Sequence, residues 1–128
     1  MSEFKTKMVA EDINDGVWVI HEDLIYESDL IGRVVVPAGF QTDFASVPRV
    51  PVAYWFYGGR AHHEAAIHDA LYREDYPGNV TFDMANRVFL EAMECRGKHW
   101  YIRYPMYSGV CLGGRSSFHK RKMTDKLT

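Results

Sequence analysis

The sequence predicts an α+β protein in which a small N-terminal antiparallel β-sheet packs against an antiparallel helix pair and a third, C-terminal helix. Short runs of β-branched and aromatic residues lie within residues 17–48, and runs with helical periodicity follow residue 60. The 128 residues suit one domain with a single hydrophobic core. We expect this domain to span residues 1–114 and the basic segment 115–128 to be a flexible tail.

The strands are predicted from three short runs, residues 17–21, 24–26 and 32–36, which are rich in β-branched or aromatic side chains. Asp15-Gly16 is a turn signal before the first run. A sheet of three or four such strands leaves an apolar face to be covered. We therefore expect the later helices to lie on one face of the sheet.

The segment 62–73 predicts a helix that carries functional residues. It is rich in alanine, and neither glycine nor proline interrupts residues 60–76. Helical spacing places His68, Asp69 and Tyr72 on one broad face. An imidazole beside a carboxylate indicates a candidate catalytic pair. The alternative is a half-buried pair that only satisfies its own hydrogen bonds.

A second helix is predicted over residues 81–96. Thr81 suits the N-cap position of this helix, and Gly97 suits the C′ position after it. Apolar residues repeat at helical spacing along the segment, which is typical of an amphipathic helix. Phe89 and Met93 lie on this stripe and are expected in the core.

The connection between the two helices, residues 74–80, is short enough to fold them back antiparallel. The first helix then faces Asn86 on the second. Buried polar groups need hydrogen-bond partners, so we expect them to bond one another. Five residues are predicted to converge on one polar site beneath the aromatic segment 52–59: Asp43, His68, Asp69, Tyr72 and Asn86.

The residues before the first helix supply further candidates. One interpretation is that a loop delivers Asp43 and Ser46 to His68; the alternative is that their side chains cap a local turn. The aromatic segment 52–59 is either a lid or apolar surface for acyl chains or another protein, or it fills the core. The candidate substrate-binding residues are Ser46, Tyr57 and Arg73.

The C-terminal part predicts a further helical stretch over residues 99–112. Pro105 either kinks this stretch or starts a new helix. The residues after Gly113-Gly114 are short of apolar side chains and basic. They form either a solvated tail or a contact for an acidic partner.

Composition limits the partners and the compartment. The net charge of −2 gives no reason to expect nucleic acid. Cys95 and Cys111 are too few for a disulfide framework and indicate free thiols in a reducing compartment. The N-terminus has no apolar signal core, and no run reaches transmembrane length. Nothing in the sequence indicates an oligomeric state.

The order His68-Asp69, Tyr72 and then Phe89 on a second helix resembles the helix pair of phospholipase A2. The resemblance implies that His68 is a general base, Asp69 a calcium ligand and Tyr72 a support for the pair. The second-helix aspartate of that family, which orients the histidine, falls on Asn86 here. An amide holds a tautomer but does not stabilise an imidazolium. The glycine-rich calcium loop and the cysteine framework of the secreted enzymes are missing from the sequence.

A second resemblance covers more of the chain. It rests on V-P-A-G-F-Q-T-D-F-A-S-V-P-R at 36–49, H-D-A-L-Y at 68–72 and A-N-R-V-F at 85–89. In this order the motifs resemble a family of small uncharacterised proteins of bacteriophages and prophages. The usual pattern has Asp in place of Asn86, which favours a weakened or non-catalytic member. The resemblance implies synthesis in the cytoplasm of a bacterial host, with association with the virion left open.

Three functions follow from these observations. The first is a phage structural or accessory protein that keeps the His-Asp pair for stability. The second is a metal-assisted ester or phosphoester hydrolase with His68 as base and with calcium on Asp69 and Asp43. Zinc on His63, Asp69 and Asp43 is a further alternative, although no His-x₃-His or Cys-x-x-Cys spacing supports it. The third is a binding protein whose aromatic segment and basic tail contact a virion or host protein.

Overall fold

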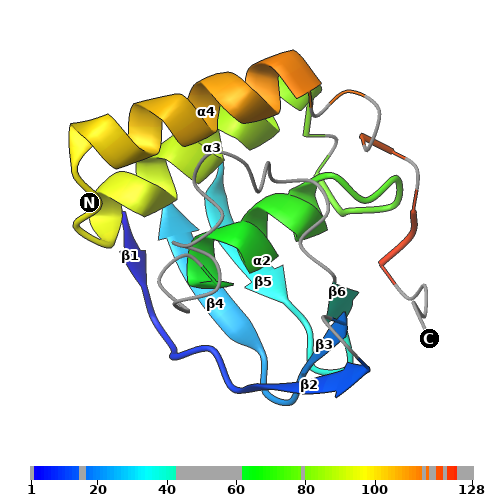
Figure 1. Cartoon of the computed structure of the whole chain (residues 1–128). Helices are drawn as coiled ribbons and strands as arrows, with labels where there is room; N and C mark the ends of the chain where they lie inside the picture. Colours follow the sequence, from blue (N-terminus) through cyan, green and yellow to red (C-terminus); the bar gives the residue numbers. More distant parts are fainter. Residues whose placement is uncertain are drawn as a thin grey trace.

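The computed structural model describes residues 2–14, 17–42, 62–78, 80–113, 115, 118–119 and 121–123. It has the predicted α+β fold, with strands before helices along the chain (Figure 1). The described strands are β1 (Glu3–Phe4), β2 (Ala10–Asn14), β3 (Val17–Ile20), β4 (Leu24–Ser28), β5 (Gly32–Val36) and β6 (Gln41–Thr42). The described helices are α2 (His62–Leu71), α3 (Phe82–Cys95) and α4 (Trp100–Gly113).

The strands form two small antiparallel sheets, where the sequence predicted one. Their strand orders are β1-β4-β5 and β2-β3-β6. The three predicted runs correspond to β3, β4 and β5. The other strands have only two residues, as in β1 and β6, or are mostly polar, as in β2, so the β pattern does not reveal them.

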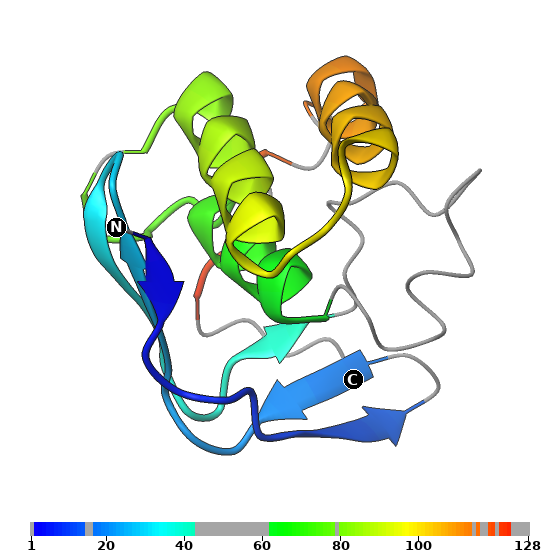
Figure 2. The same cartoon turned by 90° about the vertical axis from the view of Figure 1, so that its left-hand side faces the viewer.

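Helices α2 and α3 lie against the sheet β1-β4-β5, and α4 packs on α3 on the side away from that sheet (Figure 2). The two helices of the pair are antiparallel. Glu64 near the start of α2 contacts Arg96 just after α3, whereas Tyr72 just after α2 contacts Phe82 at the start of α3. The antiparallel helix pair is therefore as predicted, and the core lies between it and the strands.

Helix α3 forms as its sequence predicts. The Oγ1 of Thr81 accepts a hydrogen bond from the backbone N–H of Met84 at 3.1 Å, which caps the first turn. Gly97 follows the helix with a φ of +80°, a conformation that glycine adopts without strain. Phe89 and Met93 are completely buried, which confirms their predicted place in the core.

Helix α4 continues through Pro105 as one helix, so no new helix begins at that residue. Met106 and Val110 on its inner face join the core, while Trp100 and Tyr101 are exposed. Within the residues that the structure describes, no helix has the length and apolar character needed to cross a membrane.

Part of the basic C-terminal segment contacts the end of α2. The N–H of His119 donates to the carbonyl of Tyr72 at 2.8 Å, and the N–H of Glu74 donates to the carbonyl of Arg121 at 2.7 Å. These bonds hold the described residues of the segment against the α2–α3 connection. That residues 115–128 form a flexible tail outside the domain stays a prediction.

Candidate functional site

His68 lies in the last turn of α2 and points at α3. Its side chain is 0 % exposed, and its Nε2 lies 2.8 Å from the Oδ1 of Asn86. The imidazole packs against the rings of Tyr72 and Phe89, with centroid distances of 4.1 and 4.7 Å. The helix pair therefore encloses the imidazole between two aromatic rings and one amide.

Asn86 decides which nitrogen of His68 carries the proton. Its Oδ1 also accepts the hydroxyl hydrogen of Tyr72 at 2.7 Å, and its Nδ2 lies 3.9 Å from the Sγ of Cys111. A carbonyl oxygen only accepts, so Nε2 of His68 must donate. The neutral imidazole then has its lone pair on Nδ1.

Burial controls the charge of this cluster. It lowers the pKa of His68 to about 4, although the hydrogen bond to Asn86 and the charge of Asp69 act in the opposite direction. Burial also raises the pKa of Tyr72, which keeps the phenol protonated as a donor. At neutral pH the cluster of His68, Tyr72 and Asn86 is therefore uncharged.

Asp69 faces a different neighbour, because consecutive helical residues point about 100° apart. Its Oδ2 accepts from the Oγ1 of Thr42 at 2.5 Å and from the Nη2 of Arg73 at 2.8 Å. Both members of the Asp69–Arg73 ion pair are almost completely buried. The two halves of the His-Asp motif thus serve separate clusters, one towards α3 and one towards β6.

Arg73 has four partners among the residues that the structure describes. Besides Asp69, its guanidinium donates to the carbonyls of Gln41 and Lys122, each at 2.9 Å, and lies 4.5 Å from the centre of the Phe40 ring. The sequence suggested a substrate-binding role for Arg73. The structure places its charged group in the core, where it joins β6, α2 and the C-terminal segment.

A second buried carboxylate lies near the other end of α2. Glu64 is 0 % exposed, with the Nε of Arg96 3.1 Å from its Oε1 and the Nζ of Lys98 3.2 Å from its Oε2. Burial raises the pKa of Glu64, while the two cations oppose this effect. Sequence reasoning missed this cluster, because a glutamate in the first turn of a helix is ordinarily solvated.

The predicted metal ligands are not grouped in the described residues. The Nε2 of His63, a zinc candidate, accepts the backbone N–H of Met8 at 3.0 Å. Within the described ranges, no three His, Cys, Asp or Glu side chains are close enough together to hold a metal ion. Both the calcium and the zinc hypotheses use Asp69 as a metal ligand. The Oδ2 of Asp69 already accepts two hydrogen bonds from protein donors.

Three of the predicted site residues, Asp43, Ser46 and Tyr57, lie outside the described residues. The convergence of Asp43 on His68 and the substrate-binding roles of Ser46 and Tyr57 stay predictions. Thr42, next to Asp43 in the chain, was not a site candidate but bonds directly to Asp69. Its place follows from the pairing of β6 with β3, in which Thr42 lies opposite Trp18. A two-residue strand of this kind leaves no periodic signal in the sequence.

The fold and the site define a small α+β protein with a buried His-Asp motif on an antiparallel helix pair. A family model described as "Protein of unknown function (DUF1353)" matches residues 18–110, from β3 into α4. Because the match spans more than half of the chain, the chain belongs to this family. The predicted membership of an uncharacterised family is thus confirmed, while the phage origin stays a prediction. Neither a curated protein nor a solved structure matches the chain.

Proposed function

We propose that this chain is a phage-encoded structural or accessory protein in which the His-Asp motif stabilises the helix pair and has little or no catalytic activity. The environment of His68 carries the proposal. A general base becomes positively charged in the transition state. His68 is fully buried, its pKa is lowered to about 4, and its partner Asn86 supplies no negative charge. The net charge of −2 favours a virion or host protein as partner over nucleic acid.

The partners of Asp69 support the same proposal. Calcium takes about six to eight oxygen ligands and favours carboxylates whose charge is available. Asp69 is instead paired with Arg73 inside the protein and accepts a second hydrogen bond from Thr42. These bonds satisfy the carboxylate without an ion, which is the behaviour expected of a structural residue.

One observation favours the second candidate, a metal-assisted ester or phosphoester hydrolase. The bond from Nε2 of His68 to Asn86 leaves Nδ1 as the basic nitrogen. Tyr72 donates to the same oxygen of Asn86 and fixes its orientation. In the phospholipase A2 resemblance, a second-helix residue orients the histidine and a tyrosine supports it. The arrangement of this cluster is compatible with that division of roles.

Replacement of His68 by glutamine tests the proposal. If the imidazole is structural, His68→Gln should lower the free energy of unfolding by roughly 1–3 kcal/mol, because a buried hydrogen-bonded group is lost. Turnover of p-nitrophenyl butyrate and bis(p-nitrophenyl) phosphate should be absent from both proteins, with and without calcium. His99→Gln is the matched control, since His99 is exposed and should affect neither measurement.

Asn86→Asp distinguishes the two candidates. In a structural cluster the new carboxylate adds a buried charge and only destabilises the protein. In a weakened hydrolase it stabilises the protonated base and raises turnover. Calcium-dependent turnover that rises in Asn86→Asp and disappears in His68→Gln would reject the non-catalytic proposal in favour of the hydrolase.

A further inference from the structure

Strand β5 is the outer strand of the sheet β1-β4-β5, so one of its edges has no neighbouring strand among the described residues. The hydrogen bonds of β4 tell which backbone groups lie on that edge. The N–H of Ile25 donates to the Oγ1 of Thr6 at 3.0 Å, and its carbonyl accepts from the N–H of Lys5 at 2.8 Å. Both groups of Ile25 therefore point towards β1 and away from β5.

The partner of Ile25 on β5 is Val35. In an antiparallel pair, residues opposite each other either exchange both hydrogen bonds or point both groups outward. Since Ile25 points away from β5, the N–H and C=O of Val35 point away from β4. Arg33, two residues earlier, has the same orientation. Within the described part of the chain, the outward N–H and C=O groups of Arg33 and Val35 have no hydrogen-bond partner.

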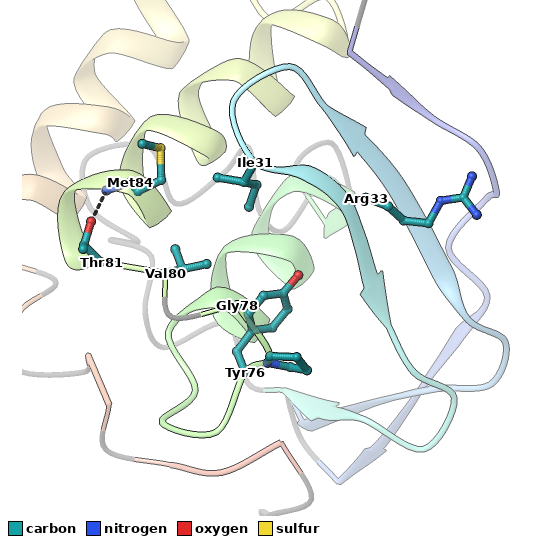
Figure 3. Close-up of a pocket in the computed structure, with 8 residues that line it drawn as sticks. Ile31, Arg33, Tyr76, Gly78, Val80, Thr81 and Met84 are labelled. Carbon is teal, nitrogen blue, oxygen red and sulfur yellow. Dashed lines mark hydrogen bonds between the residues drawn. The ribbon is translucent and has the colours of Figure 1, made fainter.

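A pocket with a mixed polar and apolar lining lies beside this edge, between β5 and the start of α3 (Figure 3). Its volume is about 240 Å³, and side chains of Ile31, Tyr76, Val80 and Met84 surround it. Figure 3 shows the side chain of Arg33 pointing away from the pocket. Arg33 thus meets the pocket through its backbone, at the free edge of β5.

We propose that this edge and its pocket bind an extended segment of a partner protein by β-strand addition. The partner backbone pairs with residues 33 and 35, whose separation along the strand is about 6.7 Å, the repeat of any extended chain. One large apolar side chain of the segment enters the pocket beside Tyr76 and Met84. A purely apolar ligand would fill the pocket but leave the strand edge without partners.

The length of β5 and its lack of proline agree with such a partner. Natural proteins usually protect an edge strand by proline, by a bulge or by making it very short. The opposite edge of the sheet, β1, has two residues, whereas β5 has five and contains no proline. The charged group of Arg33 is paired with Glu27 on the same sheet face. The inference is independent of whether His68 is catalytic.

The test is titration of the full ¹⁵N-labelled chain with capped peptides Ac-Lys-Thr-Thr-Xaa-Thr-Thr-Lys-NH₂, in which Xaa is Leu, Ile or Phe. At least one peptide should shift the amide resonances of residues 32–36 and 76–84 in a saturable manner. The same peptide, N-methylated at two consecutive central amides, should bind about tenfold more weakly, because it loses a donor to the edge while its side chains are unchanged.

A pair of variants tests the edge from the protein side. Val35→Pro removes an N–H that does not bond to β4, a position where an edge strand tolerates proline. It should fold normally and bind at least about tenfold more weakly. Val35→Thr retains the N–H and should bind like the original chain.

Four results of the titrations would overturn the inference. They are the absence of shifts with all three peptides at millimolar concentration, equal binding of the N-methylated peptide, equal binding of both variants, and shifts centred on His68. Concentration-dependent dimers that Val35→Pro abolishes in sedimentation experiments would overturn it in favour of a second copy of the chain as the occupant. The N-methylated peptide keeps the test valid if Val35→Pro fails to fold.

Discussion

The two ends of α2 each bury a carboxylate, but they neutralise it in different ways. Towards the C-terminal end, Asp69 is paired with Arg73, one turn further along the chain. Near the N-terminal end, Glu64 depends on Arg96 and Lys98, which come after α3. The first pair is local in sequence and the second cluster exists only once α3 is packed on α2.

The groups that contact the two carboxylates also differ in their burial. Asp69 accepts two hydrogen bonds from side chains that are themselves buried. Glu64 is paired with two cations, Arg96 and Lys98, but Arg96 is partly exposed to solvent. Burial therefore dominates at Glu64 and raises its pKa. The comparison teaches that one helix can bury two carboxylates with cations of different origin, one from its own next turn and two from beyond a second helix.

The largest effect should come from breaking the local pair. Arg73→Met leaves Asp69 buried without its cation and removes the bonds to Gln41 and Lys122, so we expect a loss of roughly 3–5 kcal/mol in the free energy of unfolding. Urea denaturation measures this loss. The matched control is Arg87→Met, which breaks an exposed pair of the same spacing with Asp83 and should cost less than about 0.5 kcal/mol. Equal losses in the two variants would contradict the structural role assigned to Arg73.

The next effect concerns the pH dependence at the C-terminal end. Folded His68 has a pKa of about 4, below its ordinary value of 6.5, so between these values the unfolded chain binds more protons. Stability should therefore fall as the pH decreases from 6.5 to 4, with a contribution from His68 of roughly 3 kcal/mol. His68→Gln lacks this contribution. The test compares urea denaturation of both proteins at the two pH values; identical losses would refute the assignment.

The opposite sign is expected at the N-terminal end. The pKa of Glu64 is raised above its ordinary value of 4.5, so above pH 4.5 the folded chain binds more protons than the unfolded chain. Glu64 should thus make stability fall as the pH rises through its raised pKa. The free energy of unfolding of Glu64→Gln, relative to the original chain, should increase over the same interval. A relative stability that does not change with pH would show that the two cations fully compensate the burial of Glu64.

The smallest effect should come from the hydroxyl of Tyr72. Tyr72→Phe removes one hydrogen bond, but the Oδ1 of Asn86 keeps the bond from His68 and is not left without a donor. We expect a loss of about 1 kcal/mol, measured by thermal denaturation. Tyr101→Phe is the control, because Tyr101 is exposed. A loss several times larger would mean that the phenol fixes the whole cluster and not one bond.

Those parts of the fold that depend on local sequence could be predicted. The cap at Thr81, the stripe with Phe89 and the short α2–α3 connection together determine an antiparallel pair, and this pair places His68 against Asn86. Each of these signals lies within a few residues of the element that it specifies. Two of the strands, β1 and β6, could not be predicted, because two residues are too few for a period.

The partners of the buried charges could not be predicted, for two physical reasons. Arg73 donates to two backbone carbonyls, and a carbonyl is present at every residue, so the sequence does not mark which ones are used. Glu64 reaches Arg96 across an interface that exists only in the folded protein. The apolar residues that follow Glu64 in the run 62–71 were the hint that the sequence offered.

The contacts of Arg73 also have a consequence for the order in which the chain becomes structured. Its guanidinium joins Gln41, 32 residues earlier, to Lys122, 49 residues later. Closing such loops costs chain entropy before any bond compensates for it, which slows folding. During synthesis, α2 leaves the ribosome well before residue 122 is made. The set of partners around Arg73 is therefore completed only after residue 122 has been made, and until then its partners among the described residues all lie upstream of it in the chain.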